Sequence, residues 1–196
     1  MKKHTQQTSG VFVHHSHFLG LPVPSGIEEM IFDCRDYMQS AYGCKSGYGT
    51  PPHITLIAPF TLPDGLTDRS VYECAFSALG DCRLQGLFPF EVSINGFGCF
   101  SERTLFAHVE DSKTWQKLHS LFISQFSKEI PGAIKRSDRR FYPHLSVANR
   151  DIPAGAMDEA LKHFAQLNLS EQFTASEICI YTRTASGGWK EGVRLQ

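Results

Sequence analysis

Residues 51–60 read PPHITLIAPF, and residues 141–149 read FYPHLSVAN. In each stretch a proline directly precedes a histidine, an apolar residue follows, and a hydroxyl residue comes next. Short runs that are rich in β-branched and aromatic residues are typical of strands. We therefore expect strands at 53–60 and 141–149 that carry the same small motif. This repeated motif is the observation from which we predict the fold.

Side chains two positions apart on a strand point to the same face of the sheet. His53 and Thr55 are therefore expected on one face of the first motif strand. His144 and Ser146 have the same relation on the second motif strand. If the two strands face each other, two imidazoles and two hydroxyls line one cleft.

The remaining elements follow from hydrophobic periodicity and from turn residues. Apolar residues recur at helical spacing in four segments, and five further segments have strand character. The expected helices are 25–42, 68–79, 112–130 and 155–167. The further expected strands are 11–20, 88–97, 105–110 and a closing hairpin of 173–184 and 189–196 around the glycine turn at 186–188.

This order gives each half of the chain a histidine-bearing strand, a helix and a pair of strands. It predicts an internal duplication within an α+β fold. We expect a bilobal single domain of two pseudo-symmetric lobes, with antiparallel sheets facing a central cleft and helices outside. A chain of 196 residues is long enough for one substantial core. We assign residues 11–196 to this domain and the polar residues 1–10 to a flexible N-terminus.

Composition excludes several classes of protein. The formal net charge is −1, which argues against a surface that grips long nucleic acid but leaves a nucleotide or an RNA end open. The six cysteines lack Cys-x-x-Cys spacing, so free thiols in a reducing cytosol are expected. The sequence has no apolar stretch of signal-peptide or membrane-spanning length. We expect a cytoplasmic monomer without membrane contact.

Two imidazoles and two hydroxyls suit phosphoester chemistry that needs neither a metal nor another cofactor. The unperturbed pKa of histidine is about 6.5, so one imidazole can accept a proton from the attacking oxygen while the other protonates the leaving oxygen. Two hydroxyls can donate hydrogen bonds to the non-bridging phosphate oxygens. The natural substrate for such a site is a strained 2′,3′-cyclic phosphate or a 2′-5′ linkage, which selects RNA over DNA.

The two motifs resemble those of the two-histidine phosphoesterase superfamily, the 2′-5′ RNA ligase-like proteins and cyclic phosphodiesterases. The likeness includes the segments GFGCF and LFAHVE within 96–110 and the closing stretch 178–196, and it runs from about residue 12 to the end. It implies a bilobal α+β fold, no metal requirement and a catalytic cleft. The resemblance places four residues in that cleft: the catalytic His53 and His144 and the phosphate-binding Thr55 and Ser146. Arg150 departs from the family pattern, because it comes one residue later than the arginine that often closes the second motif.

A basic run at 135–140, with four cations and one aspartate, leads into the second motif. It either attracts the phosphates of a nucleotide or RNA end or is a solvated loop. Arg140 and Tyr142 have the spacing to share the face of His144, so both are candidate substrate-binding residues. A core or rim position is the alternative for Tyr142.

Three functions from different classes are open at this point. The first is a phosphodiesterase for 2′,3′-cyclic phosphates of nucleotides or RNA ends, with 2′-5′ ligation as the reverse reaction. The second is an RNA- or nucleotide-binding module of the same fold that lacks catalysis. The third is a metalloenzyme built on His14, His15 and His17, although no acidic or cysteine partner lies nearby at ligand spacing. The presence of both motif histidines and both hydroxyls favours the first.

Overall fold

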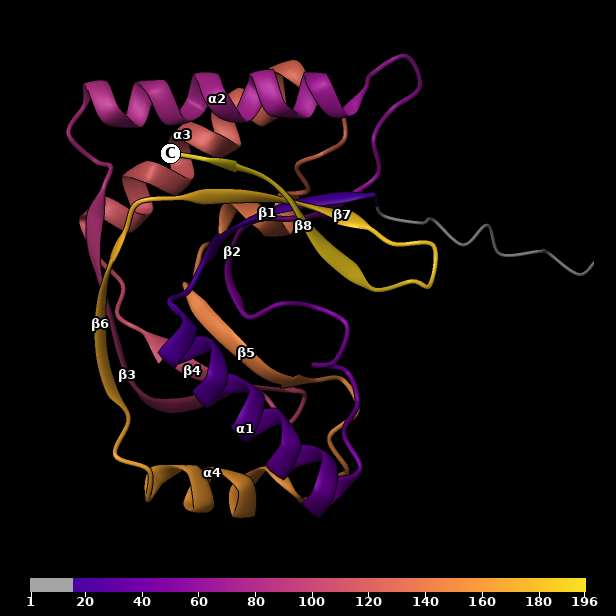
Figure 1. The fold of residues 1–196 in the computed structure, drawn as a ribbon, viewed down its shortest axis with the longest axis vertical. Helices are drawn as coiled ribbons and strands as arrows, with labels where there is room; N and C mark the ends of the chain where they lie inside the picture. The colour runs from indigo at the N-terminus through magenta and orange to yellow at the C-terminus, as the bar shows by residue number, and fades with distance from the viewer. Residues whose placement is uncertain (1–15) are drawn as a thin grey trace, which may run out of the picture.

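A computed structural model describes residues 16–196, in which helices lie above and below a strongly curved sheet (Figure 1). The α+β class expected from the sequence is confirmed. The described residues form eight strands, four α-helices and one 3₁₀ helix: β1 (His17–Pro22), α1 (Ser25–Tyr42), β2 (His53–Phe60), α2 (Asp68–Leu84), β3 (Phe90–Phe100), β4 (Thr104–Val109), α3 (Lys113–Glu129), η1 (Arg136–Arg139), β5 (His144–Asn149), α4 (Met157–Ala165), β6 (Ser170–Ala175), β7 (Ile178–Arg183) and β8 (Trp189–Leu195).

The strands form one antiparallel sheet with the order β6-β3-β4-β5-β2-β1-β7-β8, rather than two separate sheets. The two motif strands, β2 and β5, are neighbours at its centre. They are joined through a single residue pair, Ile54 and Leu145, both fully buried. Four strands lie on each side of this narrow seam. The two halves of the sheet do not coincide with the N- and C-terminal halves of the chain, so the duplication expected from the motif stays a prediction.

One half of the sheet, β3 to β6, comes from the continuous stretch 90–175, whereas the other half joins β1 and β2 to the C-terminal β7 and β8. The β3–β4 hairpin follows the first motif in sequence, yet it pairs with β5 of the second motif. The β7–β8 hairpin, at the C-terminal end, returns to pair with β1. In Figure 1 the yellow C-terminal strands accordingly lie beside the indigo β1. The cleft at the seam is thus framed by strands from both ends of the sequence.

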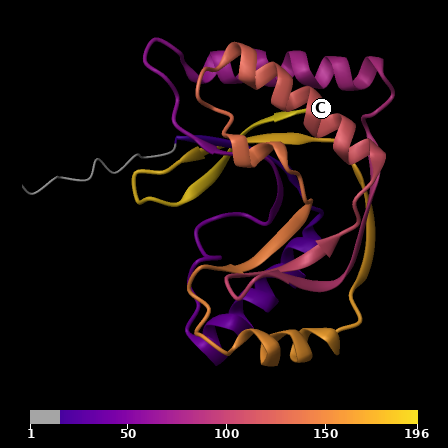
Figure 2. The same ribbon diagram turned by 180° about the vertical axis from the view of Figure 1, so that it is seen from behind.

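The helices divide between the two halves of the sheet. Helices α2 and α3 pack on each other and against the half that contains β2 and β8, while α1 contacts β5 and α4 contacts β3 (Figures 1 and 2). On α3, the Ser112 hydroxyl accepts from the Trp115 amide at 3.2 Å and caps the helix. Within the described residues, no helix combines the length and apolar character needed to cross a bilayer.

Helix α1 places its apolar face under β5. Ile31 and Met38 are fully buried there. The helix ends at Gly43, which has φ 73° and donates its amide hydrogen to the carbonyls of the last turn. This left-handed conformation favours glycine at a helix end. Helix α1 thus has the bounds 25–42 expected from the sequence.

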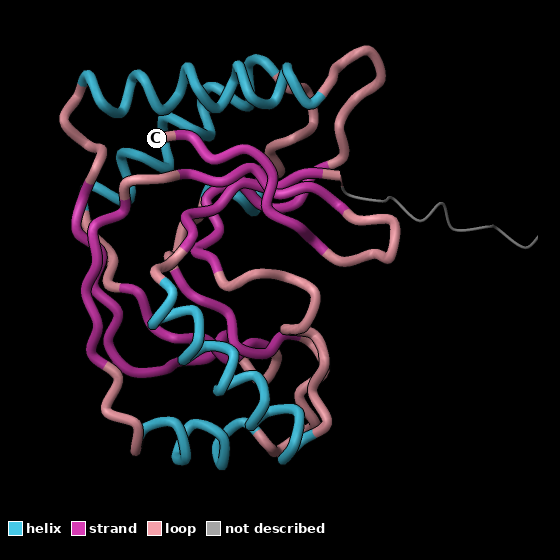
Figure 3. Tube along the Cα trace, in the orientation of Figure 1, coloured by secondary structure: helices cyan, strands magenta, loops and turns pink. Residues whose placement is uncertain are grey.

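The remaining differences from expectation concern where elements begin and end (Figure 3). Helix α2 continues to Leu84, and β5 begins at His144 rather than at residue 141. The segment 173–184 is not one strand: it divides between β6, which pairs with β3, and β7, which pairs with β8. Residues 1–10, and residues 11–15 of the first expected strand, lie outside the described part of the chain.

Candidate active site

Each motif histidine is held by the backbone carbonyl two residues before it. Nδ1 of His53 lies 2.8 Å from the carbonyl oxygen of Pro51, and Nδ1 of His144 lies 2.7 Å from that of Tyr142. A carbonyl only accepts, so each Nδ1 carries a proton and donates it. In the neutral form of each ring, Nε2 therefore holds the lone pair. The repeated motif presents two imidazoles in the same tautomer.

One cavity of about 580 Å³ lies at the seam between β2 and β5, and we call it the histidine cleft. Alternation along the two strands brings side chains from both motifs to it. The structure brings together here all four residues that the sequence placed in one cleft: His53, Thr55, His144 and Ser146.

The histidine cleft is strongly cationic. No aspartate or glutamate among the described residues lines it, and four cationic side chains do: Arg35, Lys135, Arg150 and Arg183. The Arg183 guanidinium lies over the ring of Trp189, with 5.0 Å to the ring centroid. A concave site lined by one sign of charge concentrates ions of the opposite sign. The cleft is therefore suited to a phosphate anion.

Arg35 is a buried cleft residue that sequence reasoning missed, as it also missed Arg183 and Trp189. It comes from α1 and is only 4% exposed. Its guanidinium donates from Nη1 to the Thr50 carbonyl at 2.7 Å and from Nη2 to the Ser146 carbonyl at 3.2 Å. It thereby ties the segment before the first motif to the second motif. One signal was present: an arginine on the face of Ile31 and Met38 is a cation among core positions.

Burial lowers the pKa of Arg35 to about 10, so the guanidinium stays charged at neutral pH. The space that the Arg35 side chain occupies depends on the absence of a side chain at Gly47. A Cβ at that position would lie 2.9 Å from Cδ of Arg35 and 2.7 Å from the Val147 carbonyl. The Arg35 side chain therefore lies in a narrow space beside Gly47 and the Val147 carbonyl.

The two histidines have different surroundings. The His53 ring packs against Phe18 and Tyr181, with ring centroids 4.5 and 5.1 Å apart, and its Nε2 lies 3.1 Å from Oγ1 of Thr55. The His144 ring contacts the edges of Phe100 and Phe106, with centroids 5.0 and 5.4 Å apart. No hydrogen bond joins Nε2 of His144 to another group in residues 16–196.

These surroundings lower the pKa of each imidazole by a different amount. Burial lowers the pKa of His53 to about 4, and the nearby charges of Arg35 and of a protonated His144 act in the same direction. Burial also lowers the pKa of His144, by a smaller amount. His53 is therefore the harder of the two to protonate.

A second cavity of about 320 Å³ adjoins the histidine cleft and shares Thr55, Ala58 and His144 with it. We call it the aromatic cavity, since Phe100, Phe141 and Tyr142 line it together with Arg140.

The two candidate substrate-binding residues both lie at the aromatic cavity, outside the histidine cleft. They precede the start of β5, so strand alternation does not set their direction. Tyr142 is 66% exposed, which excludes a core position.

The histidines of the first strand do not form a cluster that the structure describes. His14 and His15 lie outside the described residues. His17 is 4% exposed, and its Nε2 lies 3.2 Å from a carboxylate oxygen of Asp68. No group of three or more histidine, cysteine, aspartate or glutamate side chains in residues 16–196 is placed to hold a metal ion. The six cysteines are free thiols, and all except Cys99 are buried.

Comparison with known proteins gives one family and a set of similar folds. The 2′-5′ RNA ligase superfamily matches residues 23–187. Among solved structures, Escherichia coli LigT complexed with 3′-AMP matches with a TM-score of 0.62 at 15% identity, over 92% of this chain and 97% of that chain. TT0787 of Thermus thermophilus matches with a TM-score of 0.59 at 16% identity, over 92% of this chain and 96% of that chain. These likenesses show a shared fold. Among curated protein sequences, none matches.

Proposed function

This chain belongs to the 2′-5′ RNA ligase superfamily, the two-histidine phosphoesterases, and we propose that it is a metal-independent phosphodiesterase for 2′,3′-cyclic phosphates of nucleotides or RNA ends. Family membership supports an enzyme that acts on phosphodiesters. The observation that carries the finer proposal is the histidine cleft, where two carbonyl-anchored imidazoles and two hydroxyls lie among four cations. The 3′-AMP bound to LigT supports a nucleotide as ligand, since it is a product expected from opening a cyclic adenosine phosphate.

The unequal pKa values assign different roles to the two histidines. His53, whose pKa is lowered to about 4, is neutral at physiological pH and accepts a proton from the attacking water. The water oxygen forms a bond to phosphorus as the bond to one ribose oxygen breaks. His144, whose pKa is lowered less, takes up a proton more readily, and it donates this proton to the leaving ribose oxygen. Solvent exchange then returns both rings to their starting forms.

The remaining groups of the two cavities bind and stabilise the phosphate. The hydroxyls of Thr55 and Ser146 donate hydrogen bonds to the non-bridging oxygens, whose charge grows in the transition state. The cations of the histidine cleft add to this stabilisation without a metal ion. At the aromatic cavity, Tyr142 stacks on the base and Arg140 contacts a phosphate of the substrate.

The alternative is a nucleotide- or RNA-binding module of the same fold that lacks catalysis. Binding alone needs cations and aromatic surfaces, but it does not need two imidazoles fixed in one tautomer. The paired carbonyl anchors therefore favour the enzyme. The same geometry would also serve 2′-5′ RNA ligation as the reverse reaction. We expect the protein to act as a cytoplasmic monomer.

The test is a panel of 2′,3′-cyclic nucleotides, cyclic-phosphate-ended RNAs and 2′-5′ oligonucleotides, assayed with EDTA present and with the product phosphate located by NMR. We expect turnover that EDTA leaves unchanged and that His53→Ala and His144→Ala each reduce by about 10²- to 10⁴-fold. Far-UV circular dichroism of both variants checks that they fold. Substantial residual turnover in a folded variant, or loss of activity with EDTA, would contradict the mechanism.

A further inference from the structure

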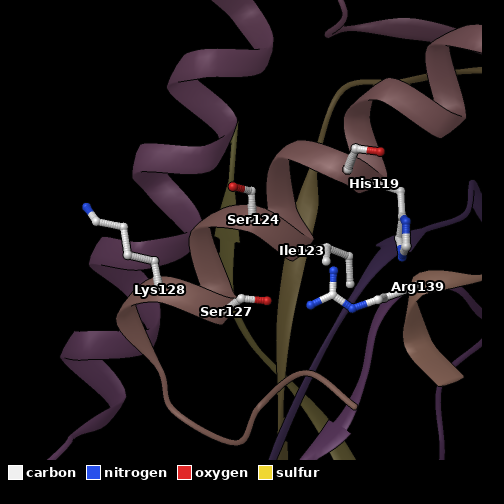
Figure 4. A pocket seen from close by; sticks show the side chains of 7 residues that line it. His119, Ile123, Ser124, Ser127, Lys128 and Arg139 are labelled. Carbon is white, nitrogen blue, oxygen red and sulfur yellow. The ribbon is translucent and has the colours of Figure 1, made fainter. Parts of the chain in front are cut away.

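A third cavity, of about 470 Å³, lies along α3 (Figure 4). We call it the α3 groove. Three serines on one face of the helix line it, together with one imidazole and two cations: Ser120, Ser124, Ser127, His119, Lys128 and Arg139. No aspartate or glutamate among the described residues lines the groove, so its charge is positive.

The α3 groove continues the path that begins at the candidate active site. His119 lines both the α3 groove and the aromatic cavity. The aromatic cavity in turn shares Thr55 and His144 with the histidine cleft. The three cavities are thus adjacent in series, each sharing lining side chains with the next, and the candidate catalytic pair lies at one end.

The basic run supplies one cation to each cavity of this series. Lys135 lines the histidine cleft, Arg139 lines the α3 groove, and Arg140 lines the aromatic cavity together with Asp138, whose carboxylate accepts from the Lys135 amide and the Ser137 hydroxyl. The short 3₁₀ turn η1, with its flanks, separates these three cationic side chains. Charge spaced along a path matches a ligand that carries one charge per repeating unit, as a phosphodiester backbone does.

His119 is a buried polar side chain whose ring nitrogens are unused by the protein. It is 5% exposed and stacks on Phe141 with ring centroids 4.2 Å apart, but no hydrogen bond of its ring to another described residue is found. In Figure 4 its imidazole extends from α3 toward Arg139. Burial lowers the pKa of His119 to about 4, so it offers one donor and one acceptor at neutral pH. Ribose hydroxyls can use both.

The donors left for a ligand in the α3 groove are few and well defined. Ser120 donates its hydroxyl hydrogen to the Gln116 carbonyl at 2.8 Å, which leaves the hydroxyls of Ser124 and Ser127. Lys128 is paired with Glu129 at 2.8 Å, so much of its charge is already matched. Arg139 makes no ion pair with a described residue and is the principal free cation of the groove.

We propose that the α3 groove binds the sugar–phosphate backbone of the RNA strand whose cyclic phosphate end lies in the histidine cleft. This inference rests on the proposed function, and it makes a strand, rather than a mononucleotide, the preferred substrate. The terminal base stacks in the aromatic cavity, and the next phosphates of the strand contact Arg140 and then Arg139. Hydroxyl and imidazole groups of the α3 groove hydrogen-bond the backbone without reading sequence.

The test compares Arg139→Gln with Arg136→Gln, a matched control from the same basic run that lines none of the three cavities. The substrates are a short oligoribonucleotide with a 2′,3′-cyclic phosphate end and adenosine 2′,3′-cyclic phosphate. We expect Arg139→Gln to raise KM for the oligonucleotide about five- to tenfold, as loss of one charged contact would, and to leave mononucleotide turnover unchanged. Arg136→Gln should change neither. An equal loss on both substrates, or no loss on the oligonucleotide, would overturn the proposal.

A binding measurement separates this proposal from the proposed function. Fluorescence anisotropy of the same oligonucleotide with an unreactive 3′-phosphate end gives Kd without turnover. Arg139→Gln should weaken binding by the same factor and reduce the slope of log Kd against log salt by about 0.7, the value for one phosphate contact in a single strand. If this holds but wild type cleaves neither substrate, the proposed function fails and the groove stands. If wild type cleaves both substrates and the two variants bind alike, the groove fails and the proposed function stands.

Discussion

The two motif histidines are anchored in the same way but lie in different environments. Each donates its Nδ1 hydrogen to the carbonyl two residues earlier, at 2.8 Å for His53 and 2.7 Å for His144. His53 packs against rings of β1 and β7, close to the charge of Arg35. His144 lies beside the exposed Phe100, and both side chains line the aromatic cavity.

This contrast shows how a duplicated motif can acquire two roles. Repetition alone supplies two imidazoles of one tautomer, which would be interchangeable in equal surroundings. Unequal burial and one nearby cation separate their pKa values. The proposed assignment of His53 as base and His144 as acid follows from the surroundings of the motifs.

The largest expected effect comes from assaying an alanine variant of each motif histidine on two substrates that differ in their leaving group. With a nucleoside p-nitrophenyl phosphodiester, the leaving phenolate needs no proton, so the general acid becomes dispensable. We expect His144→Ala to lose about 10²- to 10⁴-fold in kcat on the cyclic substrate but far less on the nitrophenyl ester. His53→Ala should lose activity on both. Steady-state kinetics of the four combinations measures this.

The reverse pattern, in which the activated ester rescues His53→Ala, would exchange the two roles while leaving the overall mechanism in place. Rescue of neither variant would argue that both histidines act on phosphate binding. Intact folds, checked by circular dichroism, are required for either conclusion.

The next largest effect concerns Arg35, the cation whose charge lowers the pKa of His53. Arg35→Gln removes both guanidinium contacts and should lower kcat/KM by about 10- to 100-fold through misplacement of the motifs. Because the charge of Arg35 lowers the pKa of His53, the same variant should also move the acid limb of the pH–rate profile to higher pH. Arg35→Lys keeps the charge, so it should lower the rate and leave that limb in place.

The sign of the wild-type profile follows from the same pKa values. A base must be neutral, so kcat/KM rises as pH increases through the pKa of His53, about 4. An acid must be protonated, so kcat/KM falls as pH increases through the lowered pKa of His144, below 6.5. A bell-shaped profile with its optimum on the acid side is expected. An acid limb that stays at the same pH in the Arg35→Gln variant would contradict a charge effect on the pKa of His53.

A smaller effect is expected at Gly20, which lies beside only one of the two histidines. A Cβ there would lie 3.0 Å from Cδ2 of His53 and 3.0 Å from the Ile54 carbonyl, so the ring or the strand must shift. Gly20→Ala should lower kcat about tenfold. Gly26→Ala is the control, because a Cβ added at this position of α1 would have no other atom within 4 Å. Equal activity of both variants would show that the His53 ring tolerates displacement.

The smallest effect is on stability. The pKa of His53 is about 4 in the folded protein and about 6.5 when unfolded, so the unfolded chain binds the proton first. Stability is therefore fully present above pH 6.5 and falls as pH decreases toward 4, by on the order of 1–3 kcal/mol for this group. Thermal melts should show that His53→Gln flattens this pH dependence more than His144→Gln does. Equal flattening would mean that the two sites are buried alike.

The elements of this fold could be predicted from sequence because their periodicity is local. The repeated motif also placed His53 and His144 in one cleft, since alternation along a strand fixes which side chains share a face. Strand pairing between distant segments was not accessible in this way. Nothing in residues 173–184 indicates that two residues between β6 and β7 carry the chain from one half of the sheet to the other.

The polar residues that support the site were harder to predict for a different reason. Arg35 and His119 lie on the buried faces of α1 and α3, where periodicity predicts core. What decides their roles is the partner across the interface: two carbonyls for Arg35 and an open cavity for His119. Such contacts depend on tertiary packing. The basic run, in contrast, was visible as charge, but its division among three cavities depends on the turn of η1.

The helices that pack on the opposite half of the sheet also bear on how the molecule unfolds. Residues 90–175 supply all four strands of one half, but α3 from this stretch packs on β2 of the other half, and α1 packs on β5, so neither half keeps its helices without the other. The seam itself is a single residue pair, yet the connecting segments cross it repeatedly. We expect the two halves to melt in one cooperative transition, although a duplicated architecture with separable halves would allow two. The cleft would then be lost as a unit with the fold.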